Sequence, residues 1–295
     1  MVHRGGDTTM MPDNRVRHAE RIERVLAHIE AADERALSLD RLASIACLSP
    51  FHFHRVFRLM TGETLAETVR RVRLARSLPD LANPDETVTR AAAGAGYGSS
   101  QAYARAFRAA TGGSASELRA GRSELMARLL RPAQEPSAQS PMAVEIVSTE
   151  PLRLLAIRNI GAYSELNATY ERLFERVFAH HPMEALAGIY GIWHEDPRFT
   201  EATALHFDCA IAVGDLAPPD GIEILALAGG RHARLRHVGS YQTLHDSIDR
   251  LYAAVLSRAA DEIGDQPLFV HYVDDPESRP ETEWRSDIYL PLAPG

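Results

Sequence analysis

The chain has 295 residues, 45% of them hydrophobic and 24% charged, and its formal net charge is −8. This length suggests two domains at about 100–200 residues each, and the composition excludes a fibrous or disordered chain. The negative net charge also argues against nucleic-acid binding, because proteins that bind polyanions usually carry a basic surface.

The charge is divided unevenly along the chain. All 32 basic residues are Arg. Residues 15–131 contain 19 Arg against 13 acidic residues, a net charge of +6, whereas residues 142–295 contain 12 Arg against 24 acidic residues, a net charge of −12. A basic half beside an acidic half indicates that the first half meets a polyanion and the second half something neutral or cationic.

Several classes of protein and site are not expected. Residues 1–14 lack the apolar core of a signal peptide and are expected to form a disordered arm. No apolar run approaches about 18 residues, so we expect a cytoplasmic protein without a membrane span. The cysteines, Cys47 and Cys209, form no Cys-x-x-Cys pair, and the pairs His52-x-His54 and His180-His181 lack further ligands. The sequence therefore predicts no metal, no cofactor and no catalytic group.

The pattern of apolar residues changes at a Pro-rich segment, residues 131–141. Residues 15–130 are rich in Ala and Arg, with apolar residues at spacings of three and four, which is typical of helices. Residues 142–295 contain short β-like runs such as HFDCAIAV and DIYLPL between two helical segments. We expect an all-α domain at 15–130, a linker at 131–141, and an α+β domain at 142–295.

The helical half contains an internal repeat with an offset of 50 residues. The identical pairs are Ser49/Ser99, Arg55/Arg105, Phe57/Phe107, Arg58/Arg108, Thr61/Thr111 and Gly62/Gly112. Each copy is predicted to be a helix, a tight turn and a second helix, and a helix at about 65–78 joins the copies. Two such units would present their second helices about one DNA turn, roughly 34 Å, apart.

Each second helix is predicted to be amphipathic. The buried stripes are expected to be Phe53, Val56, Phe57 and Met60 in the first copy, and Tyr103, Ala106, Phe107 and Ala110 in the second. The opposite sides carry Arg, His, Ser and Gln and are expected to be exposed. Arg can donate two hydrogen bonds to guanine and Gln can bind adenine bidentately, so these faces suit the reading of a major groove.

Residues 18–122 resemble the DNA-binding domain of AraC/XylS-type transcriptional regulators, which has two helix-turn-helix motifs. The resemblance lies in LSLDRLASIACLSPFHFHRVFRLMTGETLAETVRRVRLARS and VTRAAAGAGYGSSQAYARAFRAATGGSASELR. It implies binding to double-stranded DNA through residues on both second helices: Phe51, His54, Arg55, Arg58, Ser100, Gln101, Arg105 and Arg108.

Three residues depart from the pattern of that family, and one of them is Ala115, which replaces a usual Pro near the end of the domain. Cys47 stands in the first turn where the family usually has Gly, so a positive φ would cost more there. Pro79 stands near the end of the joining helix and is expected to shorten or kink it.

The acidic half also contains a repeat, with an offset of 78 residues that later becomes 79. The identical pairs include Arg158/Arg236, Gly161/Gly239, Tyr163/Tyr241, Leu166/Leu244, Leu173/Leu251, Val177/Val255 and Asp208/Asp287. Each copy is predicted to be a strand, a Gly-x-Tyr turn, a helix and two strands. Two β-α-β-β units would form one curved antiparallel sheet with both helices on one face, and a ligand is expected between the copies.

Residues 143–293 resemble the GyrI-like (gyrase-inhibitor-like) small-molecule-binding domain, through motifs such as IRNIGAY, LAGGRHARLRHVGSYQTL and WRSDIYLPL. The resemblance implies an effector, often a bulky lipophilic cation held between aromatic faces and a carboxylate. Trp193, Glu283 and Asp287 are the favoured candidates, and an unbroken strand from Glu283 to Leu290 would place both acids on one face. The full set of candidates is Tyr190, Trp193, Tyr252, Tyr272, Glu283, Asp287 and Tyr289.

These features predict a one-component transcriptional regulator whose DNA affinity depends on a small molecule, with RNA polymerase as a further candidate partner. Two alternatives stay open. The C-terminal domain could instead hydrolyse a reactive, drug-like molecule with a carboxylate as general base, which needs a raised pKa. It could also bind a protein partner such as a gyrase.

Overall fold

A computed structural model describes residues 14–32, 37–130, 143–274 and 277–294. The described parts of Met1–Arg21, Leu42–Val56 and Ala138–Gly295 form one compact unit, and those of Ile22–Arg41 and Phe57–Ser137 form another. Apart from Asn14, the predicted arm and the predicted linker lie outside the described residues. Within the described ranges, no helix is both long and apolar enough to cross a membrane.

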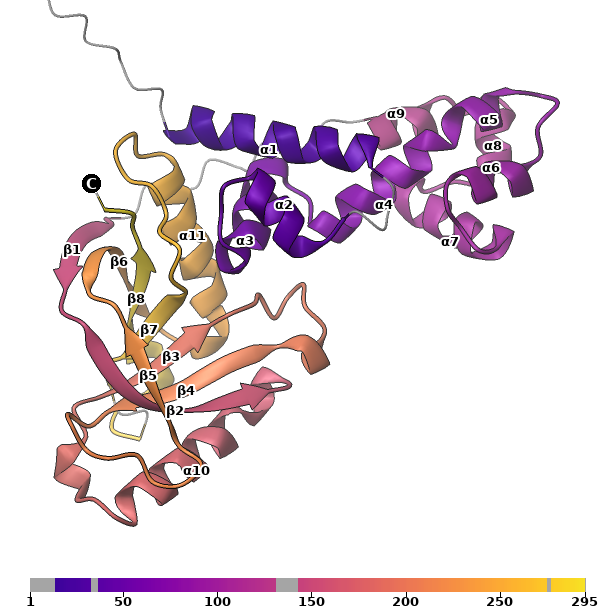
Figure 1. Ribbon diagram of the computed structural model, residues 1–295. Helices are drawn as coiled ribbons and strands as arrows, with labels where there is room; N and C mark the ends of the chain where they lie inside the picture. The colour runs from indigo at the N-terminus through magenta and orange to yellow at the C-terminus, as the bar shows by residue number, and fades with distance from the viewer. Residues whose placement is uncertain (1–13, 33–36, 131–142, 275–276, 295) are drawn as a thin grey trace, which may run out of the picture. The chain divides into compact units, whose positions relative to one another are not determined.

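The N-terminal half is helical, as expected (Figure 1). Its helices are α1 (Asn14–Ala31), α2 (Leu39–Ile45), α3 (Pro50–Thr61), α4 (Leu65–Arg76), α5 (Leu78–Ala82), α6 (Val88–Gly94), α7 (Ser100–Thr111), α8 (Ala115–Arg119) and α9 (Glu124–Leu130). The pairs α2–α3 and α6–α7 are the two predicted helix-turn-helix repeats.

The turns of the two pairs use equivalent residues in the left-handed region. Cys47 has φ +52°, and Gly96, at the equivalent position of the second pair, has φ +78°. A residue with a Cβ atom loses about 1–2 kcal/mol in this conformation, which glycine adopts freely. The costlier turn expected at Cys47 is therefore present.

The joining helix is shorter than the predicted 65–78, and the reason is Pro79. α4 ends at Arg76, and Pro79 stands in the first turn of α5, where a residue without an N–H group loses no hydrogen bond. The shortened helix that Pro79 predicts is confirmed.

Helices α4 to α9 share one apolar core. Tyr103 and Phe107 of α7 are fully buried, and the Tyr103 hydroxyl lies 2.7 Å from the hydroxyl of Ser77. The aliphatic residues around them come from four other helices, namely Leu74, Leu78, Leu81, Leu118, Leu125 and Leu129. This core holds α7 in a single orientation.

The buried stripe of α7 follows a spacing of four rather than the predicted three and four. Thr111 is buried beside the two aromatic rings, and its hydroxyl donates to the carbonyl of Phe107 (2.7 Å). Ala106 is half-buried and packs against this core, whereas the prediction for Ala110 is wrong, since Ala110 is exposed. In α3, Met60 is likewise half-buried, whereas Phe53, Val56 and Phe57 are buried as expected.

The C-terminal half contains one sheet of eight strands in the order β1-β6-β8-β7-β3-β4-β2-β5, and every neighbouring pair is antiparallel. The strands are β1 (Glu145–Thr149), β2 (Leu152–Ile160), β3 (Gly188–Trp193), β4 (His206–Ala212), β5 (Glu223–Leu227), β6 (Gly230–Val238), β7 (Leu268–Tyr272) and β8 (Arg285–Pro291). The helices are α10 (Leu166–Phe178) and α11 (Leu244–Leu256).

The strand order confirms the predicted duplication. The unit β2–α10–β3–β4 is repeated as β6–α11–β7–β8, and the two copies meet where β3 pairs with β7, with Gly191 opposite Val270. Strands at equivalent positions lie at equal distances from this central pair. The edge strands β1 and β5 extend the sheet by one strand in each copy.

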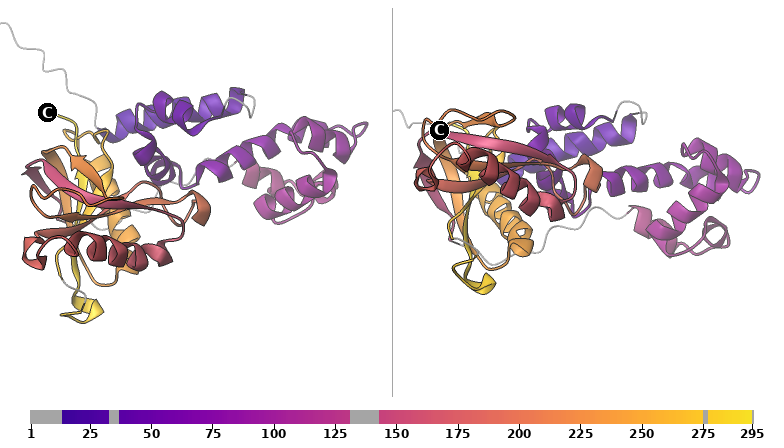
Figure 2. Two further views of the ribbon diagram at one scale, coloured as in Figure 1. Left: turned by 60° about the horizontal axis from the view of Figure 1, so that its bottom comes forward. Right: turned by 90° about the horizontal axis from the view of Figure 1, so that it is seen from below.

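Both helices cover the same face of the sheet, as predicted (Figure 2). Leu173 and Val177 of α10 pack on Leu155, Phe207 and Cys209. Residues of the opposite parity form a second apolar layer on the other face, made of Leu154, Ala156, Tyr190, Ile192, Ala210, Leu227 and Phe269. Alternation along the strands thus assigns the predicted ligand residues that lie on strands to one of two faces.

Candidate functional site

The second helix-turn-helix motif presents the expected polar face. α7 begins after Ser99, whose side chain accepts a hydrogen bond from the backbone of Ala102 (3.2 Å). Because Tyr103 and Phe107 point into the core, the opposite side of the helix points outward. Gln101, Arg105 and Arg108 are exposed there, and Ser100 is half-buried.

The first motif differs from this expectation at its most important residue. Phe51 and His54 of α3 are exposed and Arg58 is half-buried, but Arg55 is only 7% exposed. The prediction of an exposed Arg55 is therefore wrong. Residues Leu42–Val56 belong to the compact unit that contains the C-terminal sheet, and that sheet's helix and loops supply the groups that bury Arg55.

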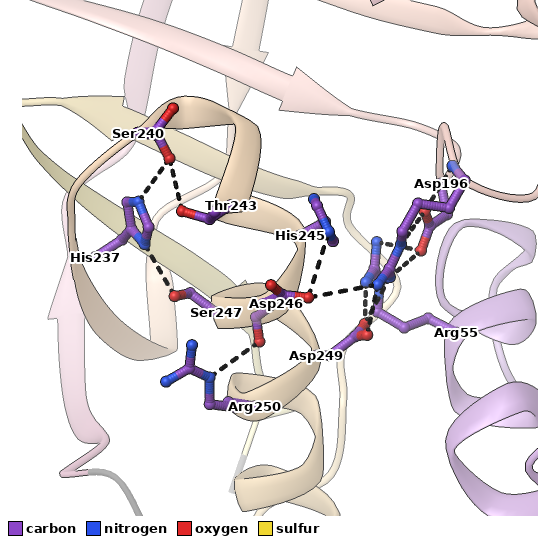
Figure 3. Close-up of polar contacts among 11 residues, drawn as sticks. Arg55, Asp196, His237, Ser240, Thr243, His245, Asp246, Ser247, Asp249 and Arg250 are labelled. Carbon is purple, nitrogen blue, oxygen red and sulfur yellow. Dashed lines mark hydrogen bonds and ion pairs between the residues drawn. The ribbon is translucent and has the colours of Figure 1, made fainter. Parts of the chain in front are cut away.

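Arg55 makes ion pairs with two carboxylates of the C-terminal half (Figure 3). Its Nη1 atom donates to Oδ1 of Asp249 in α11, and its Nη2 atom lies 2.9 Å from Oδ2 of Asp196, in the loop after β3. Its guanidinium carbon lies 5.6 Å from the centre of the Tyr252 ring. A cation is thus held by two carboxylates and an aromatic ring.

Arg198 completes this cluster. Its Nη2 atom lies 2.6 Å from Oδ2 of Asp196, and its Nη1 atom lies 3.0 Å from Oδ2 of Asp249. Burial opposes the charge on Asp196, but hydrogen bonds from Arg198 and the charge of Arg55 outweigh it and lower the pKa of Asp196 to about 2. Two guanidinium groups therefore face two buried carboxylates, and Oδ1 of the exposed Asp246 lies 3.9 Å from Nη1 of Arg198.

His52 fixes the same helix through neutral hydrogen bonds. Its Nε2 atom lies 2.7 Å from the carbonyl oxygen of Gln266, and its Nδ1 atom lies 2.5 Å from the Tyr252 hydroxyl. Since a carbonyl only accepts, Nε2 carries the proton and Nδ1 accepts from Tyr252. Burial lowers the pKa of His52 to about 4, so the ring is neutral at pH 7.

A small cavity of about 20 Å³ lies where α3 meets the C-terminal half. It is lined by Phe51, His54, Arg55, Trp193, His194, Glu195, Asp196, Ile248, Tyr252 and Leu268. Two predicted effector residues, Trp193 and Tyr252, thus share one site with three predicted DNA-contacting residues. This volume is enough for about one water molecule, whereas ligand sites usually occupy about 300–1,000 Å³.

The other predicted effector residues do not join this site. Tyr272 lies on the helix-covered face, where its ring contacts Tyr170 (6.3 Å) and Tyr241 (4.9 Å). Tyr190 and Tyr289 lie on the opposite face. Tyr190 stacks on His271 and Tyr289 stacks on Phe269, each at 4.7 Å between ring centres. The candidates on strands therefore lie on both faces of the sheet.

The assumption of an unbroken strand from Glu283 to Leu290 is wrong. Glu283 ends a short 3-10 helix, Glu281–Glu283, and β8 begins at Arg285. Glu283 is exposed, whereas Asp287 is buried and forms a bidentate ion pair with Arg236 (2.7 and 2.6 Å). The two acids therefore do not share a face.

The ion pair of Asp287 has a counterpart in the other copy of the repeat. Asp208 of β4 accepts from Arg158 (2.7 and 2.9 Å) and lies 2.8 Å from Nε2 of His194. Burial opposes ionisation, but hydrogen bonds from His194 and Arg158 lower the pKa of Asp208 to about 2. These repeated pairs tie neighbouring strands together, which accounts for the identity of both residues in both copies.

None of Asp196, Arg198 and Asp249 was predicted as a DNA contact or an effector contact. The sequence feature that could have indicated this cluster is Asp249, which stands in a helix beside the apolar residues Ile248, Leu251 and Tyr252. A carboxylate buried among such residues needs a cationic partner. Within the described ranges, no three His, Cys, Asp or Glu side chains are grouped to hold a metal ion.

Comparisons with known proteins cover both halves of the chain. The family described as GyrI-like small molecule binding domain matches residues 142–293, and a family described as helix-turn-helix domain matches residues 42–121. The probable transcriptional regulator YgiV of Escherichia coli (strain K12) is 28% identical over 106 residues, which are 35% of this chain and 66% of that protein. The chain thus spans just under two thirds of that relative.

Two further comparisons are with a curated protein and with a solved structure. The TetD protein of transposon Tn10 from Escherichia coli is 32% identical over 96 residues, which are 32% of this chain and 70% of that protein. A cryo-EM structure of an EcmrR–DNA complex covers 83% of each chain with 14% identity and a TM-score of 0.46.

Proposed function

This chain belongs to the GyrI-like small molecule binding domain family and carries a helix-turn-helix domain in front of that domain, and from this combination we propose a transcriptional regulator. The N-terminal motifs bind double-stranded DNA, and the C-terminal domain binds a small molecule that changes the DNA affinity. By linkage, the effector acts only to the extent that it prefers one of the two states of the DNA-binding domain.

The outward face of α7 is the observation that carries the proposal for DNA. Gln101, Arg105 and Arg108 project from a helix whose other side is fixed by Tyr103 and Phe107 in a packed core. A rigid helix with Arg and Gln at its first turns suits direct contacts to base edges. We assign α7 as a recognition helix and α3 as its counterpart in the first motif.

Selection of bound DNA from random sequence, followed by binding measurements with variants, tests this assignment. Arg105→Ala should weaken binding to the selected site by about 1–3 kcal/mol and relax the sequence preference at one position. Arg176→Ala is a matched control, because it removes an exposed Arg from α10. Equal affinities of the Arg105→Ala variant and the control would contradict the assignment.

For the effector, we propose a site at Trp193 and Tyr252, and a lipophilic cation as its ligand. Aromatic faces there lie beside the carboxylate of Asp196. Tetraphenylphosphonium is a suitable probe, and the Trp284→Phe variant leaves Trp193 as the single tryptophan. We expect the probe to change the fluorescence of this variant with saturation, and a linear response without saturation would contradict a defined site.

The geometry gives hydrolysis less support. A carboxylate that acts as general base near neutral pH needs a raised pKa, whereas the pKa values of Asp196 and Asp208 are lowered to about 2.

A regulator of this kind acts at promoters, so RNA polymerase is the protein partner that we expect, and the cytoplasm is the expected compartment.

A further inference from the structure

The first recognition helix is bound by the effector domain of its own chain. The Phe51 ring lies 5.5 Å from the His194 ring, His52 contacts Tyr252 and Gln266, and Arg55 is paired with two carboxylates. These residues occupy the first two turns of α3. A helix-turn-helix protein uses the same part of its recognition helix to contact base edges.

The contacts of Arg55 exclude a simultaneous contact with a base. Its Nη1 atom is directed at Asp249 and its Nη2 atom at Asp196. Bidentate reading of guanine needs two donors of the same guanidinium group. Arg55 is also only 7% exposed, so no phosphate or base reaches it while these ion pairs persist.

The carboxylates are arranged to receive this guanidinium rather than merely to lie near it. Arg198 donates to both Asp196 and Asp249 and holds them together, and Tyr252 lies beside the bound cation. Both carboxylates are more than 90% buried. A buried cluster of this kind is stable only when its charges are matched, and Arg55 supplies the second positive charge.

We propose that Asp196 and Asp249 form a docking site that binds the first recognition helix in competition with DNA. The inference rests on the proposed function, since it concerns how the same regulator is controlled. In the docked state the chain reads DNA through α7 alone. In the released state Arg55 also contacts DNA. The affinity for DNA then increases, and the chain recognises a longer DNA site.

The test compares two double variants of the full chain. Asp196→Asn/Asp249→Asn removes both carboxylates from Arg55, and Asp215→Asn/Asp220→Asn removes two exposed carboxylates of the same domain. Removing two negative charges by itself favours DNA binding, and the control variant has the same change in net charge. We expect the first variant to bind the selected site about tenfold more tightly than the control, a typical strength of coupling between sites.

Hydrogen exchange of the peptide that contains residues 50–56 gives a second readout. Without DNA, exchange should be faster in the Asp196→Asn/Asp249→Asn variant than in the control, and the single variant Asp249→Asn serves if the double variant unfolds. In the wild type, added DNA should speed exchange in residues 244–252, which α3 then uncovers.

The outcomes separate the two proposals. If the wild type binds DNA but both double variants bind equally tightly and exchange equally, docking is refuted and the proposed function stands. If no protein binds DNA, both proposals fail.

Discussion

The buried His52 makes the stability of the docked helix depend on pH. Burial lowers the pKa of His52 to about 4, the charge of Arg55 acts in the same direction, and the hydrogen bond to Gln266 and the charge of Asp265 oppose it. The folded protein thus binds this proton more weakly than the unfolded chain, where the pKa is about 6.5. His52 therefore stabilises the fold fully above pH 6.5, and this stability is lost as the pH falls toward 4.

The expected loss between pH 7.5 and 5.0 is about 2 kcal/mol, from the ratio of the two protonation equilibria at these pH values. Urea unfolding followed by circular dichroism measures it. Burial also lowers the pKa of His18 to about 4, so acid costs stability at that residue too. The comparison is therefore between the wild type and His52→Gln, which keeps a polar side chain without a titrating group.

We expect the His52→Gln variant to lose about 2 kcal/mol less than the wild type over this range. The loss due to His18 is the same in both proteins and cancels. If both proteins lose the same free energy, His52 is not held in its neutral form, and the reasoning that places it between Tyr252 and Gln266 is refuted.

Three further predictions concern the turn at Cys47, one of the repeated ion pairs of the sheet and the binding of a ligand at Trp193. Cys47→Gly should raise the free energy of unfolding by about 1 kcal/mol, because glycine removes the strain at φ +52° and returns part of that gain as backbone entropy; a lower value in urea unfolding would contradict this. Asp208→Asn should destabilise the fold by about 2 kcal/mol, since it leaves Arg158 without its buried partner, and a loss below about 0.5 kcal/mol would show that this ion pair is not stabilising. A ligand that saturates the Trp193 site should raise the DNA affinity of the wild type but not that of the Asp196→Asn/Asp249→Asn variant. The reason is that a cavity of about 20 Å³ can admit the ligand only after α3 has moved. Unchanged or lower DNA affinity in the wild type would contradict a site shared by the ligand and α3.

The sequence was sufficient for features that depend on neighbours along the chain. The apolar periodicity around Tyr103 and Phe107 predicted which side of α7 is buried, because a helix brings residues three and four apart to one face. Pro79 predicted where α4 ends, and the position of Cys47 in the first turn predicted a costly positive φ, which Cys47 adopts. The repeat that pairs Asp208 with Asp287 predicted a duplicated sheet, since two similar units tend to adopt similar folds.

The predicted positions of side chains were wrong where they depended on regular secondary structure or spacing continuing over several residues. Glu283 was placed with Asp287 on the assumption of an unbroken strand, and the short 3-10 helix before β8 removes the alternation on which that placement depended. Ala110 was placed in the core because a small apolar residue fits the pattern, but two aromatic rings and Thr111 already fill it.

Two helix-turn-helix motifs, a duplicated sheet with two helices on one face, and the division of charge between the halves could all be predicted from local patterns and repeats. The contacts of Arg55 could not, because they depend on the tertiary fold. The periodicity of α3 shows that this residue points away from the helix's own core, but not what meets it there. Its partners lie more than 140 residues further along the chain, and only folding brings Asp196 and Asp249 to the same point. The net negative charge first argued against DNA binding. At Asp196 and Asp249, two of these negative charges instead pair with Arg55, the arginine that we assign to DNA binding.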